Sequence, residues 1–249
     1  MMRVAVLNDI HGNLPALDAA LEDVRRAGAD RIVVGGDVLL GPMPRETMDR
    51  LLALDLPVEF LYGNGEIAVL DQLHGTSRAP FPAAYAAMIR WNGEQLSDAQ
   101  RQLIATWPMT IRLHVPPFGD VLFCHATPRD WNEIFLKTTA EEKLMPVIDA
   151  ANAAIVVCGH THMQFDRMVG KTRVINTGSV GMPFGRPGVD WLLLGDEVEL
   201  RHVGYDLDAA VAQFRRKDCP MMEEFIVPAV LTPAPEEQML AAFSGAELK

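Results

Sequence analysis

The sequence predicts an α/β protein in which two β-sheets pack face to face with helices outside them. In the first third of the chain, short apolar runs alternate with stretches of helical spacing, which indicates parallel β-α-β units. From about residue 110 to residue 205, apolar runs come in pairs joined by turn residues, which indicates antiparallel hairpins. Because 49% of the 249 residues are apolar, a core large enough for such layers is available.

Three buried strands are expected near the start of the chain, at residues 4–7, 32–34 and 58–62. Between the first two, Asn13 is expected to cap a helix with apolar residues at helical spacing, and Gly28 to end it. The second strand runs into Asp37 and closes a β-α-β unit whose crossover should be right-handed. Pro44 then begins a second helix, so this part supplies parallel strands with helices between them.

Residues from about 66 to 108 are predicted to form a helical insertion. The segment lacks β-branched runs and is rich in alanine and in helical patterns. Within it, Ser97 and Gln100 have the spacing of a capping box before a short helix. Two interpretations of the insertion carry equal weight: a layer that packs on the sheets, or a cap over the substrate.

The second half of the chain is expected to form three hairpins, at residues 111–124, 164–176 and 191–203. After the first hairpin, Thr139 and Glu142 have capping-box spacing at the start of a helix. Pro146 lies inside that helical pattern and should interrupt or restart the helix, because proline lacks the amide hydrogen that the helix needs.

The end of the chain reads as a helical tail. Asp206 is placed to cap one helix, and a second helical pattern covers about residues 236–243. We therefore expect residues 1–205 to form one domain and residues 206–249 to form a C-terminal helical appendage. The tail either wraps the domain or contacts a second copy of the chain in a homo-oligomer.

Composition and cysteine count limit the classes of function. The formal charge of −11 argues against broad nucleic-acid binding, which needs a basic face. The three cysteines are an odd number, and two lie in predicted buried strands, which favours a reducing compartment over a disulfide framework. The first strand begins close to the start, and no apolar run is long enough to span a bilayer. We therefore expect a cytoplasmic protein without membrane contact.

Polar side chains that can bind metal ions follow five of the predicted strands. They are Asp9, His11, Asp37, Asn64, His125, His160 and His162. Because α/β sheets keep their ligands at the carboxyl ends of their strands, these seven side chains are expected to converge. Tetrahedral zinc takes four ligands, so seven suit two adjacent divalent ions better. The imidazole, carboxylate and amide groups, without thiolate, favour manganese first and iron, nickel or zinc as alternatives, rather than calcium.

Two such ions about 3.5–4 Å apart form the clamp used in hydrolytic phosphoryl transfer. One carboxylate bridges them, and a hydroxide shared between them attacks phosphorus in line. The constellation therefore predicts a metal-dependent phosphoric ester hydrolase. A lone buried histidine is usually a hydrogen-bonded core residue, but that explanation fails for four histidines that each follow a strand beside Asp or Gly.

The order of the motifs resembles the calcineurin-like metallophosphoesterase superfamily, especially its small bacterial phosphodiesterase-like members. The motifs are Asp-x-His, Gly-Asp, Gly-Asn, a single His and Gly-His-x-His, and the resemblance covers roughly residues 3–205, including the segment 176–181. It implies a four-layer αββα sandwich of two packed mixed β-sheets. It also implies two metal sites: one formed by Asp9, His11, Asp37 and His162, the other by Asp37, Asn64, His125 and His160, with Asp37 as the bridge.

The chain departs from this family at one functional position. Where the family commonly has Gly-Asn-His, this chain has Gly63-Asn64-Gly65. The family's histidine is the one usually assigned to stabilise the phosphorane or protonate the leaving group, and general acid–base groups supply about 10²–10⁴-fold in rate. We therefore expect a substrate with a stable leaving group, or an acid from elsewhere, with His74 or a bound water as candidates.

Beside the metal ligands, we expect Arg129 to take part in catalysis together with Asp37, Asn64 and His125. Arg129 follows His125 by four residues, and its planar guanidinium could hold a non-bridging phosphate oxygen. A surface salt bridge with Asp130 or Glu133 is an equally weighted alternative. Arg45 and Arg186 are weaker candidates for the same role.

These observations predict a dinuclear metal-dependent phosphoesterase that acts on a small phosphate ester or nucleotide. A phosphodiesterase is favoured over a monoesterase. The alternative is a metal-containing nucleotide-binding sensor or structural protein, in which catalysis is weakened because Gly65 stands where the family usually has histidine.

Overall fold

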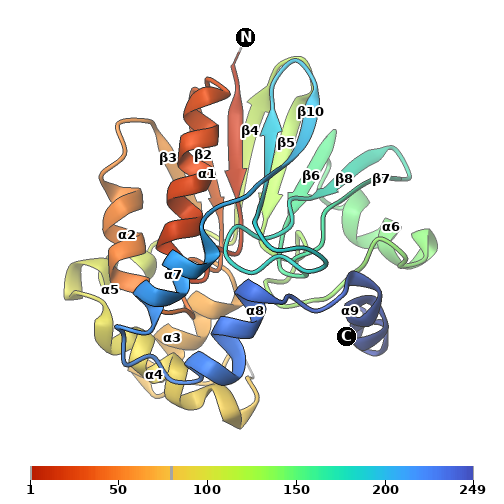
Figure 1. The fold of residues 1–249 in the computed structure, drawn as a ribbon. Helices are drawn as coiled ribbons and strands as arrows, with labels where there is room; N and C mark the ends of the chain where they lie inside the picture. Colours follow the sequence, from red (N-terminus) through yellow and green to blue (C-terminus); the bar gives the residue numbers. More distant parts are fainter. Residues whose placement is uncertain (1, 79–80, 249) are drawn as a thin grey trace.

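Two five-stranded β-sheets form the centre of the computed structural model, which describes residues 2–78 and 81–248 (Figure 1). The first sheet, in the order β10-β9-β1-β2-β3, contains β1 (Val4–Leu7), β2 (Arg31–Gly35), β3 (Val58–Leu61), β9 (Val189–Leu194) and β10 (Val198–Val203). The second, in the order β4-β5-β6-β8-β7, contains β4 (Thr110–Val115), β5 (Gly119–Cys124), β6 (Ile155–Cys158), β7 (Phe165–Val169) and β8 (Thr172–Asn176). In each sheet three neighbouring strands are parallel and the others antiparallel, so both sheets are mixed.

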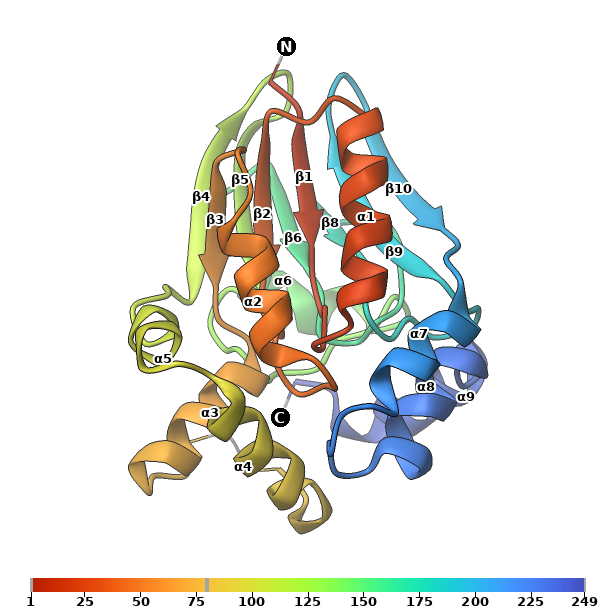
Figure 2. The ribbon, with the colours of Figure 1, turned by 60° about the vertical axis from the view of Figure 1, so that its left-hand side comes forward.

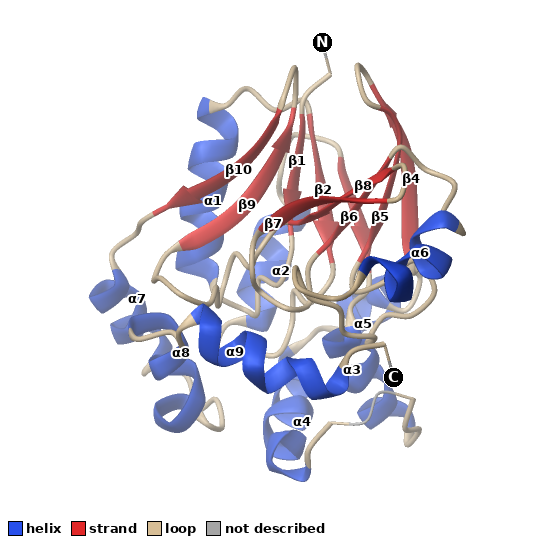
Figure 3. Ribbon diagram, turned by 90° about the vertical axis from the view of Figure 1, so that its right-hand side faces the viewer, coloured by secondary structure: helices blue, strands red, loops and turns tan. Residues whose placement is uncertain are grey.

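Helices cover the outer faces of both sheets and complete four layers. Helices α1 (Leu14–Arg26) and α2 (Pro44–Leu52) lie on the first sheet (Figure 2). Helix α6 (Glu141–Asp149) lies on the second (Figure 3). The predicted αββα sandwich, with its early parallel units and later hairpins, is therefore confirmed.

Side chains of the central strands alternate between two interfaces, as the pleat of a β-strand requires. In β1, Val4 and Val6 belong to the buried cluster between the two sheets, whereas Ala5 and Leu7 belong to the cluster under the helices. In β6 the side chains alternate in the same way between the inter-sheet cluster and a third cluster against α6. Such strands are apolar on both faces, which explains why they appear in the sequence as uninterrupted apolar runs.

The insertion and the tail supply helices that gather beyond the carboxyl ends of the parallel strands (Figures 1 and 3). The insertion contains α3 (Asn64–His74), α4 (Ala86–Gln95) and α5 (Asp98–Ile104), and the tail contains α7 (Leu207–Phe214), α8 (Val227–Leu231) and α9 (Glu236–Phe243). Short turns of helix also cover Ala83–Tyr85, Met222–Ile226 and Ser244–Ala246. Ile226, Val227 and Val230 are buried in the same cluster as α1, so the tail packs against the domain.

Most predicted helix starts are confirmed, but the start and course of α6 are not as expected. Ser97 forms its capping box with Gln100, and Asp206 accepts a hydrogen bond from Ala209 N. Helix α6, in contrast, begins after Ala140, because the Thr139 hydroxyl instead accepts a hydrogen bond from Leu136 N at 2.7 Å.

Helix α6 also continues through Pro146, where an interruption was expected. Proline here removes the hydrogen bond to the carbonyl of Glu142, one turn earlier. Both residues are exposed, so water can satisfy that carbonyl and the helix does not have to break. Within the described residues, the helices lack the combination of length and apolar character that crossing a bilayer requires.

The inter-sheet cluster makes the fold sensitive to lost volume. Phe123 in β5 is 1% exposed and packs between the sheets, so Phe123→Ala should lower the free energy of unfolding by about 3–5 kcal/mol. Met168→Ala is the control, because Met168 is 53% exposed and its loss should change stability by less than about 0.5 kcal/mol. Urea unfolding measures both variants; equal midpoints would contradict this assignment of the core.

Candidate metal centre

The seven side chains predicted to bind metal all follow parallel strands and meet at one end of the sandwich. They come from the loops after β1, β2, β3, β5 and β6. The loops after β1 and β2 stay in register beyond the strands, because His11 N donates a 2.9 Å hydrogen bond to Asp37 O. The sequence therefore identified the correct edge of both sheets.

Backbone conformation at these loops is unusual. Five of the seven residues have positive φ angles: Asp9 (55°), His11 (49°), Asp37 (52°), His160 (65°) and His162 (56°). Non-glycine residues seldom adopt this left-handed region, and each such residue costs on the order of 1–3 kcal/mol. The surrounding structure must therefore hold these loops in place, and strain of this kind is typical of functional sites.

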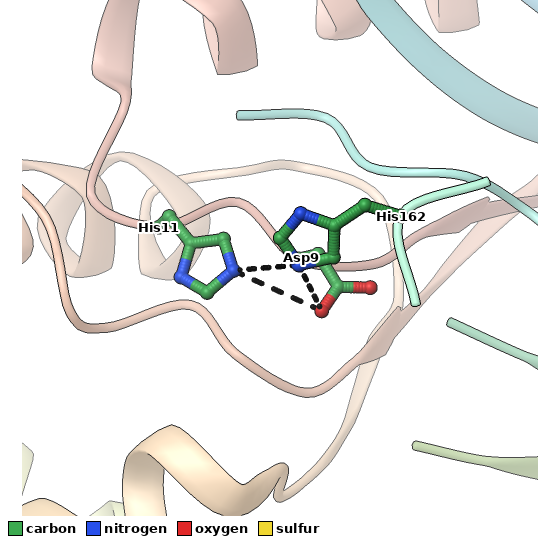
Figure 4. A group of neighbouring side chains, drawn as sticks. All are labelled: Asp9, His11 and His162. Carbon is green, nitrogen blue, oxygen red and sulfur yellow. Dashed lines mark hydrogen bonds and ion pairs between the residues drawn. The ribbon is translucent and has the colours of Figure 1, made fainter. Parts of the chain in front are cut away.

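Asp9, His11 and His162 form the first tight group (Figure 4). His162 Nε2 lies 3.2 Å from Asp9 Oδ1 and 3.0 Å from His11 Nε2. The third side of the triangle, from His11 Nε2 to Asp9 Oδ1, measures 3.9 Å. Three ligand atoms thus face one point.

Asp9, Asp37 and His125 form a second group beside the first. His125 Nε2 lies 3.6 Å from Asp37 Oδ2 and 3.9 Å from Asp9 Oδ1. Asn64 joins this group, with its Oδ1 3.0 Å from the same imidazole nitrogen. His160 lies next to it, since its ring centroid is 5.0 Å from that of His125.

The two groups share Asp9, and Asp37 also reaches both. Asp37 Oδ2 is 3.9 Å from His11 Nε2, so it faces the first group as well as the second. The structure thus brings together the side chains of both predicted metal sites. The assignment of Asp37 as the bridging carboxylate stays a prediction.

Backbone carbonyls orient the imidazole rings. The Nδ1 atoms of His11, His125 and His162 lie 3.1, 3.0 and 2.8 Å from the carbonyl oxygens of Leu39, Gly35 and Met182. A carbonyl can only accept, so these Nδ1 atoms carry the hydrogen and the Nε2 lone pairs are directed into the site. Metal-binding histidines are oriented by outer partners of this kind.

Two buried polar atoms of the site lack a hydrogen-bond partner among the described residues: Asp9 Oδ1 and His160 Nε2. The other oxygen of Asp9 accepts a 2.8 Å hydrogen bond from His160 N. A buried carboxylate oxygen without a partner is costly, and a bound cation would remove that cost. The donor set of carboxylates, imidazoles and an amide fits divalent transition-metal ions.

Burial and mutual charge shift the pKa values of the site. Burial lowers the pKa of His11 and of His160 to about 3, so both rings are neutral near pH 7 and can donate lone pairs. Burial also acts to lower the pKa of His125, but Asp37 and Asp9 raise it above its ordinary value. For Asp9, burial acts to raise the pKa, but the neighbouring histidines outweigh it and lower the pKa.

Glu66 supports the site and was not among the predicted residues. It is fully buried in α3, and its carboxylate accepts hydrogen bonds from Asp37 N at 2.8 Å, Leu39 N at 3.1 Å and Gly63 N at 2.8 Å. Burial, followed by the negative charge of Asp37, raises its pKa to about 7. Its position three residues after Gly63, as in a capping box, is the sequence signal that could have revealed it.

Other support comes from segments far away in the chain. Asn92 in the insertion accepts hydrogen bonds from Leu40 N at 3.0 Å and Gly41 N at 3.2 Å. In the segment 176–181, the Ser179 hydroxyl donates to Asp9 O at 2.8 Å. Gly159 must lack a side chain, because a β-carbon there would lie 2.3 Å from Asp9 Oδ2.

The three arginines proposed to contact phosphate form ion pairs with carboxylates instead. Arg129 forms a salt bridge with Glu133, its Nε lying 3.0 Å from Oε2, which corresponds to the alternative weighed for it. Arg45 pairs with Asp49, and Arg186 lies 3.8 Å from Asp190 Oδ1. Phosphate binding by Arg129 stays a prediction and would require it to leave Glu133.

His74 does not fit the role of a substitute acid. It is exposed at the last position of α3, whereas Asn64 begins that helix. Ten residues of α-helix separate the two by about 15 Å. An acid at position 74 is therefore too far from the cluster to protonate a leaving group there.

A small cavity of about 170 Å³ opens beside the cluster. Five of the seven predicted ligands line it: His11, Asp37, Asn64, His160 and His162. The rest of its lining, which we call the apolar pocket, consists of Leu40, Phe81, Tyr85, Met88, Met182 and Phe225. Larger hollows of about 910 and 600 Å³ elsewhere on the described surface include none of the seven ligands.

Comparison with known proteins agrees with this geometry. A model of the calcineurin-like phosphoesterase superfamily domain matches residues 2–195. An uncharacterized protein of Methanocaldococcus jannaschii is 27% identical over 243 residues, which cover 87% of this chain and 93% of the relative. The phosphodiesterase YfcE of Escherichia coli is 25% identical over 201 residues, which cover 80% of this chain and 90% of that protein.

Solved structures show the same fold. A hypothetical protein from Pyrococcus horikoshii OT3 superposes with a TM-score of 0.79 at 22% identity, over 92% of this chain and 98% of that one. A metallophosphoesterase from Sphaerobacter thermophilus gives 0.69 at 23% identity, over the same shares of 92% and 98%. At these identities the likeness supports the αββα architecture alone.

The role of Glu66 can be tested by replacing one carboxylate oxygen. In Glu66→Gln an NH₂ group replaces one carboxylate oxygen that accepts hydrogen bonds from backbone amides. The Asp37 loop should then shift, and the affinity for Mn²⁺ should fall about 10–100-fold. Glu59→Gln is the matched control: Glu59 is half-buried in β3 and pairs with Arg31, and this variant should bind Mn²⁺ as the wild type does. Isothermal titration calorimetry measures both; an unchanged affinity in Glu66→Gln would show that the Asp37 loop holds its position without that carboxylate.

Proposed function

The chain belongs to the calcineurin-like phosphoesterase superfamily, and from this premise we propose that it is a dinuclear metal-dependent phosphodiesterase for a small phosphate ester or nucleotide. The single observation that carries the proposal is a buried cluster in which Asp9, His11, Asp37, His125 and His162 bring their ligand atoms together, with Asn64 and His160 beside them. Two atoms of this cluster, Asp9 Oδ1 and His160 Nε2, lack a hydrogen-bond partner among the described residues. The relationship to the phosphodiesterase YfcE supports the same reaction class.

Two divalent ions would be held by the seven side chains. Asp9, His11, Asp37 and His162 would hold one, and Asp37, Asn64, His125 and His160 the other, with Asp37 shared. When bound, two such ions supply Lewis-acid stabilisation of the phosphoryl oxygens and activation of the attacking water. Manganese is our first choice of metal, with iron, nickel or zinc as alternatives.

The protein's own groups then fix the geometry. Neutral His11 and His160 keep their lone pairs available near pH 7. Glu66 accepts hydrogen bonds from the amides of Asp37 and Leu39, and the Gly65 amide donates to the Asp37 carboxylate at 2.7 Å, so both the loop and its carboxylate are held. The apolar pocket places side chains of low polarity beside the cluster, and such surroundings strengthen electrostatic contacts to a bound phosphate.

Charge in the cavity supports a diester over a monoester. None of the described residues that line it is a lysine or an arginine. A phosphate monoester carries a second negative charge near pH 7, which the two metal ions alone would have to neutralise here, whereas a diester carries one charge. The lack of a cationic side chain is therefore part of the support for a singly charged phosphodiester.

Metal dependence is the first test. Protein stripped with EDTA should not hydrolyse bis(4-nitrophenyl) phosphate, and Mn²⁺ or Ni²⁺ should restore turnover and raise the melting temperature, because the ions bind the folded state. Asp37→Asn should lower kcat/KM at least about 100-fold, since it alters a proposed ligand of both ions.

The control variant is Asp166→Asn, because Asp166 is exposed and pairs with Arg173 on the hairpin β7–β8. It should retain wild-type turnover. Equal activity of Asp37→Asn and the wild type would contradict the catalytic proposal, and so would restored protein that is inactive on both mono- and diesters.

A second candidate, a metal-containing nucleotide-binding sensor or structural protein, rests on Gly65. A β-carbon at this position would lie 2.9 Å from Asp37 Oδ1 and 3.2 Å from Leu40 Cδ1, so any side chain there displaces its neighbours slightly. Gly65→Ala is therefore the proper reference for Gly65→His, because both carry the same β-carbon.

If the chain is an enzyme that lacks only the acid, Gly65→His should exceed Gly65→Ala in kcat by about tenfold or more on alkyl phosphodiesters, and by little on nitrophenyl esters that need no protonation. Steady-state kinetics with both substrate types decides this. Equal rates for the two variants, with submicromolar nucleotide binding in the wild type, would favour the sensor.

A further inference from the structure

Resting on the proposed function, we propose that the apolar pocket binds an aromatic ring, the aryl group of the leaving alcohol of a phosphodiester. This assigns a substrate class to the site. The substrate is an aryl phosphodiester rather than a nucleotide whose sugar carries the leaving oxygen.

Aromatic side chains from two distant segments form the wall of the pocket. Phe81 and Tyr85 come from the insertion, and Phe225 comes from the tail. Tyr85 packs edge-on against both, with ring centroids 6.2 Å from Phe81 and 5.5 Å from Phe225. Aromatic rings favour such edge-to-face contacts, so a further ring entering the pocket would find partners of the same kind.

Size favours a single ring over a larger group. The cavity measures about 170 Å³ in all, including the space beside the proposed ligands. An apolar protein cavity of about 150 Å³ holds benzene. A nucleoside, with its base and ribose, is larger than benzene, and any of its hydroxyl groups placed against Leu40, Met88 and Phe225 would lack hydrogen-bond partners there.

The pocket adjoins the proposed metal ligands within one cavity. His11, Asn64 and His160 line this cavity together with the residues of the apolar pocket. Displacement at phosphorus is in line, so the leaving group departs on the side opposite the attacking water. In our proposal the leaving group departs into the part of the cavity that the aromatic residues line.

The absence of a side chain at position 65 agrees with an aryl leaving group. Gly65 adjoins Leu40, part of the pocket wall, and carries no proton donor. In the proposed step the oxygen of water forms a bond to phosphorus while the bond from phosphorus to the aryl oxygen breaks. The aryl oxygen takes the electron pair and leaves as aryloxide, and the proton of water passes to solvent. An aryloxide is stable enough to leave without a general acid, whereas an alkoxide is not.

Kinetics can separate recognition of the ring from the stability of the leaving group. Methyl phenyl phosphate is compared with a second methyl phosphodiester. In this second compound the phenyl group is replaced by a fluorinated secondary alkyl group whose alcohol is about as acidic as phenol. The Mn²⁺-loaded wild type should prefer the phenyl ester about tenfold or more in kcat/KM, because only the ring fills the pocket.

Variants of the pocket should remove that preference. Phe225→Ala and Phe81→Ala, from separate segments, should each lower kcat/KM about tenfold for the phenyl ester and less than about twofold for the fluoroalkyl ester. Phe118→Ala is the matched control, because Phe118 is half-buried before β5, at the opposite end of the sheets. It should leave both rates unchanged.

Binding without turnover provides an independent measurement. Calorimetry should show phenylphosphonate binding the Mn²⁺-loaded wild type about tenfold more tightly than methylphosphonate, and Phe225→Ala should abolish the difference. Equal affinities for the two phosphonates, or equal rates for the two esters in all variants, would overturn the aryl assignment while the hydrolase stands. Pocket-dependent phosphonate binding without hydrolysis of any ester would support the ring site and overturn the hydrolase.

Discussion

The rest of the structure depends on two carboxylates and four imidazoles held together away from water. Asp9 and Asp37 are 0% and 4% exposed, and ionised groups at that depth are stable only when they are paired, hydrogen-bonded or bound to a cation. The backbone amide of His160 donates to one of these carboxylates and that of Gly65 to the other. Asp9 Oδ1 and His160 Nε2 have no hydrogen-bond partner among the described residues. A bound metal ion would offset the desolvation cost of burying these two atoms.

The support for this cluster is spread over the whole chain. The first sheet and the second each contribute the ends of parallel strands, and the inter-sheet cluster keeps those ends at one level. Asn92 fixes the loop after β2 from the insertion, while Ser179 fixes Asp9 from the segment before β9. Positive φ angles at the ligands show that the loops are held in conformations they would not adopt alone.

Sequence reasoning succeeded where a local pattern has one structural meaning. Apolar runs that end in Asp or His predicted both the strands and the edge at which the ligands meet. It failed at Pro146, because exposure of the helix to water decides whether the lost hydrogen bond matters. For Arg129 the sequence left two alternatives, and the structure shows the salt bridge with Glu133, while phosphate binding stays a prediction.

By itself, the sequence predicted the layered α/β architecture and the end of the sheets at which the seven candidate ligands lie, because strand periodicity and the polar residues that end each strand are local properties of the chain. Only the tertiary structure decided what surrounds the ligands. Glu66 became a buried support because three amides from two loops point at it, and Phe81 and Phe225 became one wall because separate segments fold over the same strand ends. Contacts between residues so far apart leave no periodic trace, since each depends on how complete layers pack.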